Sequence, residues 1–184
     1  MDPINEQFEA VVLPALAEYW AAETALTAAL NEGDAAAISA ARQLAMRRAR
    51  AAANELHHFA DFAAAKNSLK LDLMRSAVAA HCTFLRSTNK VADIALLRAT
   101  ADAFKHNHLN RANAMVTGSD AIIASATGYS MLYYGEGKYG GAEQVIVTAK
   151  DNTQRALSSI LQNAADAWRR YLGRAVPEIG DYSR

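Results

Sequence analysis

Apolar residues recur at helical spacing through the first thirty positions of the chain. The dipeptide Asp2-Pro3 is typical of a helix start, and Asn31-Glu32-Gly33 is typical of a helix end. Pro14 lies inside this segment and lacks a backbone N–H, so we expect a kink there. The segment therefore predicts one long amphipathic helix. Its apolar positions are Ile4, Phe8, Val11, Val12, Ala15, Tyr19, Ala22, Leu26 and Leu30.

Three more helical segments follow after short breaks. Asp34 predicts the N-cap of an alanine-rich second helix that ends near residues 66–68. A third helix is expected from about residue 69 to 86, and a fourth from about 91 to 109. Four helices joined by short loops are typical of an antiparallel bundle.

The chain loses its helical periodicity after Arg111. Six of its nine glycines and four of its seven tyrosines fall between residues 118 and 141. Helical spacing returns from about residue 153 to 172 and stops at Gly173, which predicts a last helix and a loosely held tail from Arg174. Short apolar runs in the glycine-rich region predict strands at 112–117, 121–126, 129–134 and 144–149, the first two forming a hairpin around Gly118-Ser119-Asp120.

These segments together define the expected fold class. It is mainly α, an antiparallel four- to five-helix bundle with a small antiparallel β insertion at about 112–149, before the last helix. We expect a single domain over residues 1–173 and a tail over 174–184. The length of 184 residues is sufficient to bury a core, and alanine, with 42 residues, favours closely packed helices.

Composition and local motifs exclude several classes of protein. The single cysteine cannot form an internal disulfide, and the polar, acidic start is unlike a secretory signal. No run approaches the roughly 18 apolar residues that a membrane span requires. Phosphate-binding glycine loops, nucleophile elbows and zinc-ligand spacings are absent from the sequence. These features predict a cytoplasmic protein with no membrane association and no cofactor.

A formal net charge of zero conceals an uneven distribution of charge. Residues 1–40 carry seven acidic side chains and no Lys or Arg, whereas residues 41–111 carry twelve basic and five acidic ones. An acidic first helix packed against a basic second helix would explain this difference through solvated ion pairs. The alternative is an exposed basic face that binds an anionic partner.

The second predicted helix has a polar stripe opposite its apolar one. In a functional interpretation its arginines bind phosphates and a nearby histidine transfers protons. The alternative is the ordinary solvent face of an amphipathic helix. A metal site would need His57 or His58 with Asp61 and a ligand from another helix, such as His106 or His108. The stripe contains Arg47, Arg50, Asn54, His57, His58 and Asp61, of which Arg47, Arg50, His57 and His58 are our candidate nucleic-acid-binding residues.

The fourth predicted helix carries a second candidate site. Arg98, Asp102 and His106 follow each other at i, i+4 and i+8, with Lys105 beside them. Asp102 could orient His106 as an acid–base catalyst, while Arg98 or Lys105 stabilises a developing anion. The alternative is a ladder of helix ion pairs.

The third predicted helix contains the adjacent pair His81 and Cys82. His81 lies on an apolar stripe, so we expect a core histidine. Neighbouring residues of a helix point about 100° apart, which excludes a Cys–His catalytic dyad here.

The stretch from Gly128 to Gly141 could form a mobile lid, a stacking surface for bases or a loop that binds a protein partner. The alternative is an ordinary hairpin with aromatic cross-strand pairs. The candidate partner-binding residues of this loop are Tyr133, Tyr134, Lys138 and Tyr139.

The segment 97–106, which ends in Ala101-Asp102-Ala103-Phe104-Lys105-His106, resembles the Lys-His helix of HEPN-like proteins. The run 134–141 and the late Trp168-Arg169-Arg170 are also similar to small uncharacterised bacterial proteins that have this helix. The resemblance implies a helical bundle, often dimeric, that is either a metal-independent ribonuclease of toxin or phage-defence systems or a non-catalytic RNA- or nucleotide-binding protein.

The catalytic signature of that family is an Arg and a His with four to six residues between them. Arg98 and His106 have seven residues between them, which departs from this signature. The pairs Arg75–His81 and Arg50–His57 have the required spacing, but a chain of this composition would contain about one such pair by chance. Two hypotheses follow. The first is an RNA-directed protein with Arg98, Asp102, Lys105 and His106 as its site, and the second is a non-catalytic dimeric module that binds a protein partner through the β insertion.

Overall fold

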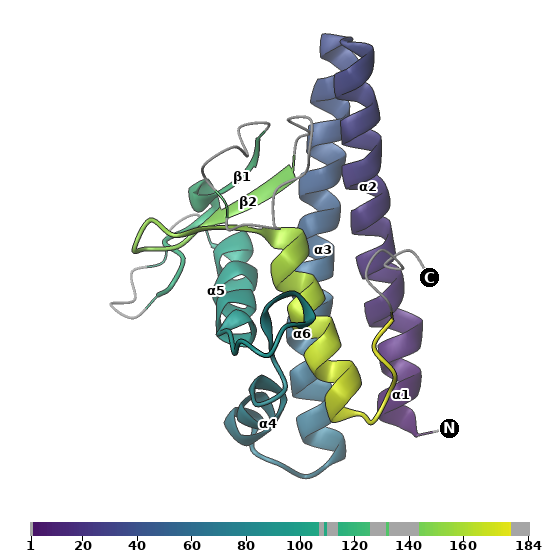
Figure 1. Ribbon diagram of the computed structural model, residues 1–184, viewed down its shortest axis with the longest axis vertical. Coiled ribbons are helices and arrows are strands. Elements are labelled where there is room, and N and C mark those ends of the chain that lie inside the picture. Colours follow the sequence, from purple (N-terminus) through teal and green to yellow (C-terminus); the bar gives the residue numbers. More distant parts are fainter. Residues whose placement is uncertain (1, 107–108, 110–113, 126–131, 133–143, 178–184) are drawn as a thin grey trace.

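The first helical segment is a continuous rod with one irregular turn (Figure 1). The computed structural model describes residues 2–106, 109, 114–125, 132 and 144–177. Helix α1 (Pro3–Gln7) is followed by a π-helical stretch (Phe8–Val12) and by α2 (Leu13–Glu32). The π-helical stretch lies directly before Pro14, whose missing N–H interrupts the regular hydrogen-bond ladder. The structure therefore shows a π-helical stretch next to Pro14, while the kink itself stays a prediction.

Helix α3 (Ala35–Lys66) runs antiparallel to α2 and forms a long hairpin with it (Figure 1). Gly33 joins the two helices in a left-handed conformation with φ 79°. The carboxylate of Asp34 caps α3 by accepting hydrogen bonds from the backbone N–H groups of Ala36 and Ala37, at 3.3 and 3.1 Å. These ends confirm the predicted boundaries of the first two helices.

The third and fourth helices are shorter than the sequence predicts. Helix α4 covers Leu71–Ala79 and α5 covers Asp93–Lys105. The chain between them contains a 3₁₀ turn (Phe84–Arg86) in which Leu85 and Arg86 have φ values of 40° and 63°. A continuous helix cannot pass through such left-handed residues, so the prediction of a helix up to residue 86 is wrong.

The prediction of a core His81 is also wrong. His81 lies beyond the end of α4, is exposed, and has its ring 6.3 Å from that of Tyr171. The neighbouring Cys82 turns inward instead, and its thiol donates a hydrogen bond to the backbone oxygen of Asn163 at 3.7 Å. Burial raises the pKa of the Cys82 thiol to about 11, so this thiol is protonated and unreactive at neutral pH.

Three short antiparallel strands form the sheet, in the order β1 (Ile122–Ser125), β2 (Gln144–Thr148) and β3 (Gln154–Ala156). The predicted strand at 121–126 is confirmed as β1. Its predicted hairpin with 112–117 is wrong, because β1 pairs with β2 and the described residues 114–117 form no strand. The predicted strand at 144–149 is confirmed as β2, whereas the one at 129–134 lies outside the described residues, apart from Leu132.

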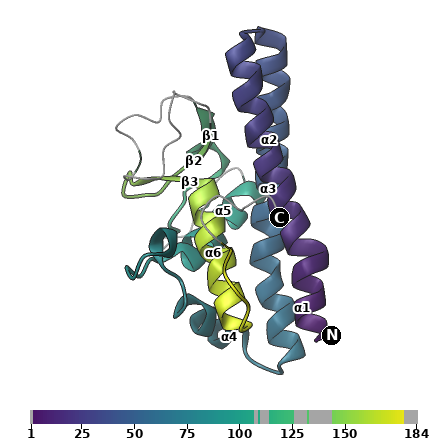
Figure 2. The same cartoon turned by 45° about the vertical axis from the view of Figure 1, so that its right-hand side comes forward.

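The sheet is fixed to the helical hairpin through buried polar groups. The backbone N–H of Val145 donates a hydrogen bond to the carboxylate of Glu23 at 3.1 Å, and the Tyr19 hydroxyl donates to the same oxygen at 2.5 Å. Burial beside this carboxylate raises the pKa of Tyr19 well above its ordinary value. The described strands therefore pack on α2 and α3, at the upper end of α5 and α6 (Figures 1 and 2).

Helix α6 (Leu157–Tyr171) passes through the centre of the molecule. Trp168 packs edge-on against Phe59 at 4.6 Å between ring centroids, and Phe59 contacts Phe8 at 5.3 Å. This aromatic group joins α6, α3 and the irregular first helix into one core. The predicted last helix is confirmed, except that its first residues form β3, and Gly173 ends it with φ 68°. Within the described part of the chain, no helix is long and apolar enough to cross a membrane.

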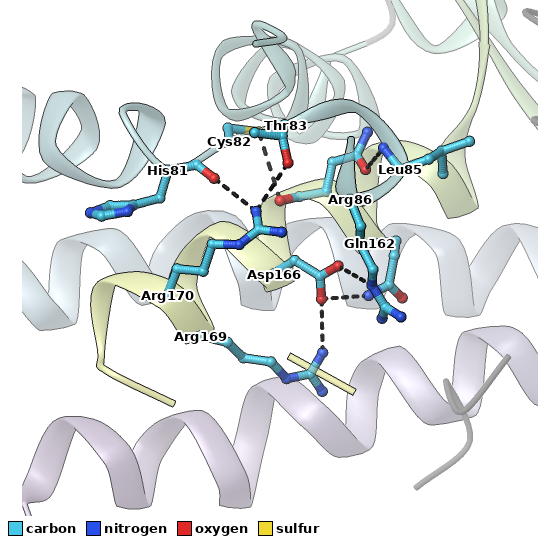
Figure 3. A network of polar contacts seen from close by, with 10 residues as sticks. His81, Cys82, Thr83, Leu85, Arg86, Gln162, Asp166, Arg169 and Arg170 are labelled. Carbon is cyan, nitrogen blue, oxygen red and sulfur yellow. Dashed lines mark hydrogen bonds and ion pairs between the residues drawn. The ribbon is translucent and has the colours of Figure 1, made fainter. Parts of the chain in front are cut away.

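The polar side of α6 is buried as well, and the segment 81–86 makes hydrogen bonds with it (Figure 3). Asp166 accepts hydrogen bonds from Arg86, Gln162 and Arg169 at 2.9, 2.7 and 3.2 Å. We call these contacts, with those that Asp93 makes with Arg155 and Asn163, the α6 network.

Within the α6 network, the Asp93 carboxylate accepts two hydrogen bonds from Arg155, at 2.8 and 3.0 Å, and one from Asn163 at 2.7 Å. The amide oxygen of Asn163 accepts from the backbone N–H of Leu85 at 2.8 Å. Helix α6 thereby holds both the strained turn and the first residue of α5 in place.

Candidate functional site

Three helices bring seven polar side chains to one region of the surface, which we call the α3–α5 cluster. Helix α3 contributes two histidines and an aspartate, α4 an arginine, and α5 two cations and an aspartate. Contacts and electrostatic interactions link these side chains across the three helices. The members are His57, His58, Asp61, Arg75, Arg98, Asp102 and Lys105.

A chain of hydrogen bonds crosses the cluster from carboxylate to ammonium. The Nδ1 atom of His58 lies 3.0 Å from Asp61 Oδ2, and its Nε2 atom lies 2.7 Å from Lys105 Nζ. An ammonium group can only donate, so Nε2 accepts and the imidazole proton resides on Nδ1, facing Asp61. The His58 side chain is 51% exposed, so solutes reach this ring. An oriented and accessible imidazole of this kind is suited to proton transfer.

Arg75 brings α4 into the cluster. Its guanidinium lies 3.6 Å from Asp61 Oδ1 and its side chain is only 15% exposed. Burial lowers the pKa of Arg75, and the nearby positive charge of Arg98 lowers it further, while Asp61 and two other carboxylates oppose the change. An arginine retains its charge under such a shift, so the site presents a partly desolvated cation that favours an anionic ligand.

His57 is the buried member of the cluster. It lies against Arg75 among apolar residues of α3, α4, α5 and α6, with 8% of its surface exposed. Burial lowers the pKa of His57 to about 4, with contributions from the positive charge of Arg75 and from His58. His57 is therefore neutral at pH 7 and contributes to the packing beside the exposed His58 side chain.

Arg98 and Asp102 extend the cluster along α5 into a cleft of about 320 Å³. The cleft is lined by these two side chains and by small or apolar ones, of which Met115 is the largest. Arg98 is exposed and Asp102 is half-buried. Four candidate catalytic residues were expected on this helix. Arg98, Asp102 and Lys105 belong to the cluster, whereas His106 does not.

His106 follows the last residue of α5 and has an extended backbone with φ −127° and ψ 129°. Helical i, i+4, i+8 spacing therefore does not apply to it, and the predicted alignment with Asp102 is wrong for that reason. His106 is exposed. An aspartate does contact an imidazole in this region, in the pair of Asp61 and His58 on α3.

Of the predicted stripe on α3, His58 and Asp61 face the cluster while Arg47 and Arg50 are exposed further along the helix. Arg50 precedes His57 by two helical turns, about 10 Å along the axis, on the same side of α3. These two exposed arginines therefore lie apart from the seven side chains of the cluster.

The remaining sequence candidates do not add to this site. The loop residues Tyr133, Tyr134, Lys138 and Tyr139, and also His108, lie outside the described residues. Within the described ranges, no group of three or more His, Cys, Asp or Glu side chains is placed to hold a metal ion. A metal ion would bind His58 through the unprotonated Nε2, and Lys105 Nζ already contacts that nitrogen.

A second, larger cleft was not predicted from the sequence. It has a volume of about 430 Å³ and lies between the start of α5, the segment 84–91 and the β2–β3 turn. Asp93 and Arg155 form part of its wall, and Met115 lines both this cleft and the smaller one. Helical and strand periodicity could not show it, because its walls come from segments that meet only in the folded protein.

Comparison of the chain with protein-family models, with curated proteins and with solved structures finds no match.

Proposed function

We propose that this protein binds RNA through phosphate contacts at the α3–α5 cluster and cleaves it there without a metal ion. The observation that carries the proposal is the Asp61–His58–Lys105 chain of hydrogen bonds beside the partly buried Arg75. Cations placed next to an oriented imidazole are the groups that phosphodiester transfer requires. The HEPN resemblance of the Lys105-His106 segment supports the same class of activity.

The cluster supports a specific sequence of proton transfers. Substrate binding separates Lys105 Nζ from His58 Nε2, so the lone pair of Nε2 faces the 2′-hydroxyl. Nε2 then takes the hydroxyl proton, while the 2′ oxygen attacks phosphorus and the bond from phosphorus to the 5′ oxygen breaks. The departing 5′ oxygen receives a proton from the Lys105 ammonium, and the products are a 2′,3′-cyclic phosphate and a 5′-hydroxyl. Arg75 and Arg98 stabilise the charge that develops on the phosphoryl oxygens. After the products leave, the 2.7 Å contact forms again and returns the proton from His58 to Lys105.

The first experiment incubates labelled total RNA with the purified protein in the presence of a chelator. We expect cleavage that His58→Ala abolishes and His106→Ala leaves intact, because His58 belongs to the chain of hydrogen bonds whereas His106 lies beyond the helix. Loss of cleavage in His106→Ala with retention in His58→Ala would move the site to the position that the sequence alone suggests. Cleavage in both variants would contradict a histidine base in this region.

Binding gives a separate measurement of the same proposal. Phosphate contacts release counterions, so affinity for single-stranded RNA should fall as salt concentration rises. The double variant Arg75→Gln/Lys105→Gln should bind more weakly and show a shallower salt dependence. The variant Arg47→Gln/Arg50→Gln removes the same amount of charge from exposed arginines outside the cluster, so its affinity should change less. RNA binding that is absent, or equal in all these proteins, would favour the alternative hypothesis, in which the protein forms a homodimer and binds a protein partner through residues 128–141.

A further inference from the structure

The larger cleft beside α5 has the size and lining of a ligand site. Its volume of about 430 Å³ falls in the range that small-molecule sites occupy, and apolar side chains form most of its wall. Two ionised side chains at the wall, Asp93 and Arg155, are nine-tenths or more buried. Buried charges that pair with each other give a cleft of this kind a fixed shape, because neither side chain can leave without its partner.

The wall also carries an aromatic ring held in position. The guanidinium carbon of Arg155 lies 5.4 Å from the centre of the Phe84 ring, and both residues line the cleft. Bonds to Asp93 fix this buried guanidinium, so it supports the ring from one side. Aromatic rings are surfaces on which unpaired bases of RNA stack. Val91, Leu96 and Met115 complete an apolar enclosure, and Asn89 and Thr153 supply an amide and a hydroxyl that can meet the polar edge of a base.

The position of the cleft relative to the α3–α5 cluster is the third observation. Met115 lines both clefts, and α5 passes along both, with Asp93 and Leu96 at the larger and Arg98 and Asp102 at the smaller. Leu96 and Asp102 are separated by six residues, about 9 Å along the helix axis. The two clefts therefore share one wall residue and lie within two turns of each other along α5.

We infer that the larger cleft is a nucleobase pocket, which holds one unstacked base of the single-stranded RNA whose phosphates contact the α3–α5 cluster. This inference rests on the proposed function and adds to it the part of the substrate that is recognised. A pocket of this kind selects single-stranded over double-stranded RNA, because a paired base cannot leave its stack without loss of its pairing.

The test separates base binding from phosphate binding by using ribonucleosides, which have no phosphate. Adenosine, guanosine, cytidine and uridine are titrated into the full-length protein up to about 10 mM, with chemical-shift changes as the readout. We expect at least one nucleoside to bind, and Ala92→Trp, which places a bulky ring in the cleft, to weaken that binding tenfold or more. Ile123→Trp is the matched control, because Ile123 is exposed on β1 and does not line the cleft.

The outcomes distinguish this inference from the proposed function. Absence of nucleoside binding, or equal binding in Ala92→Trp and the wild type, overturns the base pocket even where salt-sensitive RNA binding and cleavage persist. Conversely, nucleoside binding that Ala92→Trp removes supports the pocket even where Arg75→Gln/Lys105→Gln leaves RNA binding unchanged and the phosphate site fails. Circular dichroism of both tryptophan variants establishes that they retain the helical fold.

Discussion

The α6 network and the α3–α5 cluster both pair aspartates with cations, and they differ in their access to solvent. Asp93 and Asp166 in the α6 network are about 1–2% exposed, and each accepts several hydrogen bonds from neighbouring side chains. In the α3–α5 cluster, Asp61 and His58 are about half exposed. The aspartates of the α6 network are enclosed, whereas the cluster presents His58 and Asp61 to solvent above the buried His57.

This difference separates a structural role from a chemical one. A buried carboxylate with three donors is already satisfied, so it has little capacity to bind a further ligand, and its removal leaves buried cations without compensation. An exposed ion pair contributes little to stability, but its groups can exchange partners with a solute. We therefore expect substitutions in the α6 network to change the free energy of unfolding, and substitutions of the exposed members of the α3–α5 cluster, His58 and Asp61, to change activity.

The largest expected effect is that of Asp93→Ala. The substitution leaves the Arg155 guanidinium, whose side chain is 8% exposed, without the carboxylate that accepts two of its hydrogen bonds. Breaking a buried pair in this way costs about 3–5 kcal/mol, which urea unfolding followed by circular dichroism would measure.

The double variant Asp93→Leu/Arg155→Met is the control for that prediction. It removes both charges together, so we expect it to be more stable than Asp93→Ala. A double variant as unstable as the single one would mean that lost packing, and not the uncompensated charge, causes the destabilisation.

Local sequence signals predicted the ends of the long helices correctly, because those signals act within a few residues. Asp34 caps its own helix, and Gly33 and Gly173 adopt the left-handed conformations that glycine favours. The end of α4 gave no such signal. His81 and Leu85 continue the apolar period, but the turn at Leu85 is held by Asn163, which lies 78 residues further along the chain.

The sequence predicts several individual residues of the candidate site, but not the contacts between its helices. The polar stripe on α3 and the row on α5 are visible in the sequence, yet the pairing of His58 with Lys105 depends on how two helices pack, 47 residues apart. The sequence singles out Arg75 only through its spacing from His81, whereas in the folded protein its guanidinium lies 3.6 Å from the Asp61 carboxylate. The burial of the polar side of α6 could not be foreseen, because the same pattern is typical of a solvent-exposed helix face.

The next effect in size is a pH dependence that arises from His57. Its pKa is about 4 in the folded protein and about 6.5 in the unfolded chain, so the unfolded chain binds more protons between these values. Stability should therefore fall as pH decreases from 6.5 toward 4, by an amount on the order of 2 kcal/mol. Urea unfolding at a series of pH values measures the slope. His57→Leu, which cannot be protonated, should flatten this part of the curve, and an unchanged slope would assign it to other groups.

The smallest effect on stability is expected for Asp61→Asn. Its side chain is 44% exposed, and exposed pairs of this kind contribute at most about 1 kcal/mol, so the unfolding midpoint should change little. The carboxylate nevertheless holds the proton of His58 on Nδ1, and asparagine can present its N–H₂ group there and favour the other tautomer. RNA cleavage should then fall by about a hundredfold or more at unchanged stability.

The measurement compares unfolding curves and initial cleavage rates of the same preparations of Asp61→Asn and the wild type. A variant that loses stability and activity together would show that Asp61 is structural, and the distinction between the two groups of side chains would then fail.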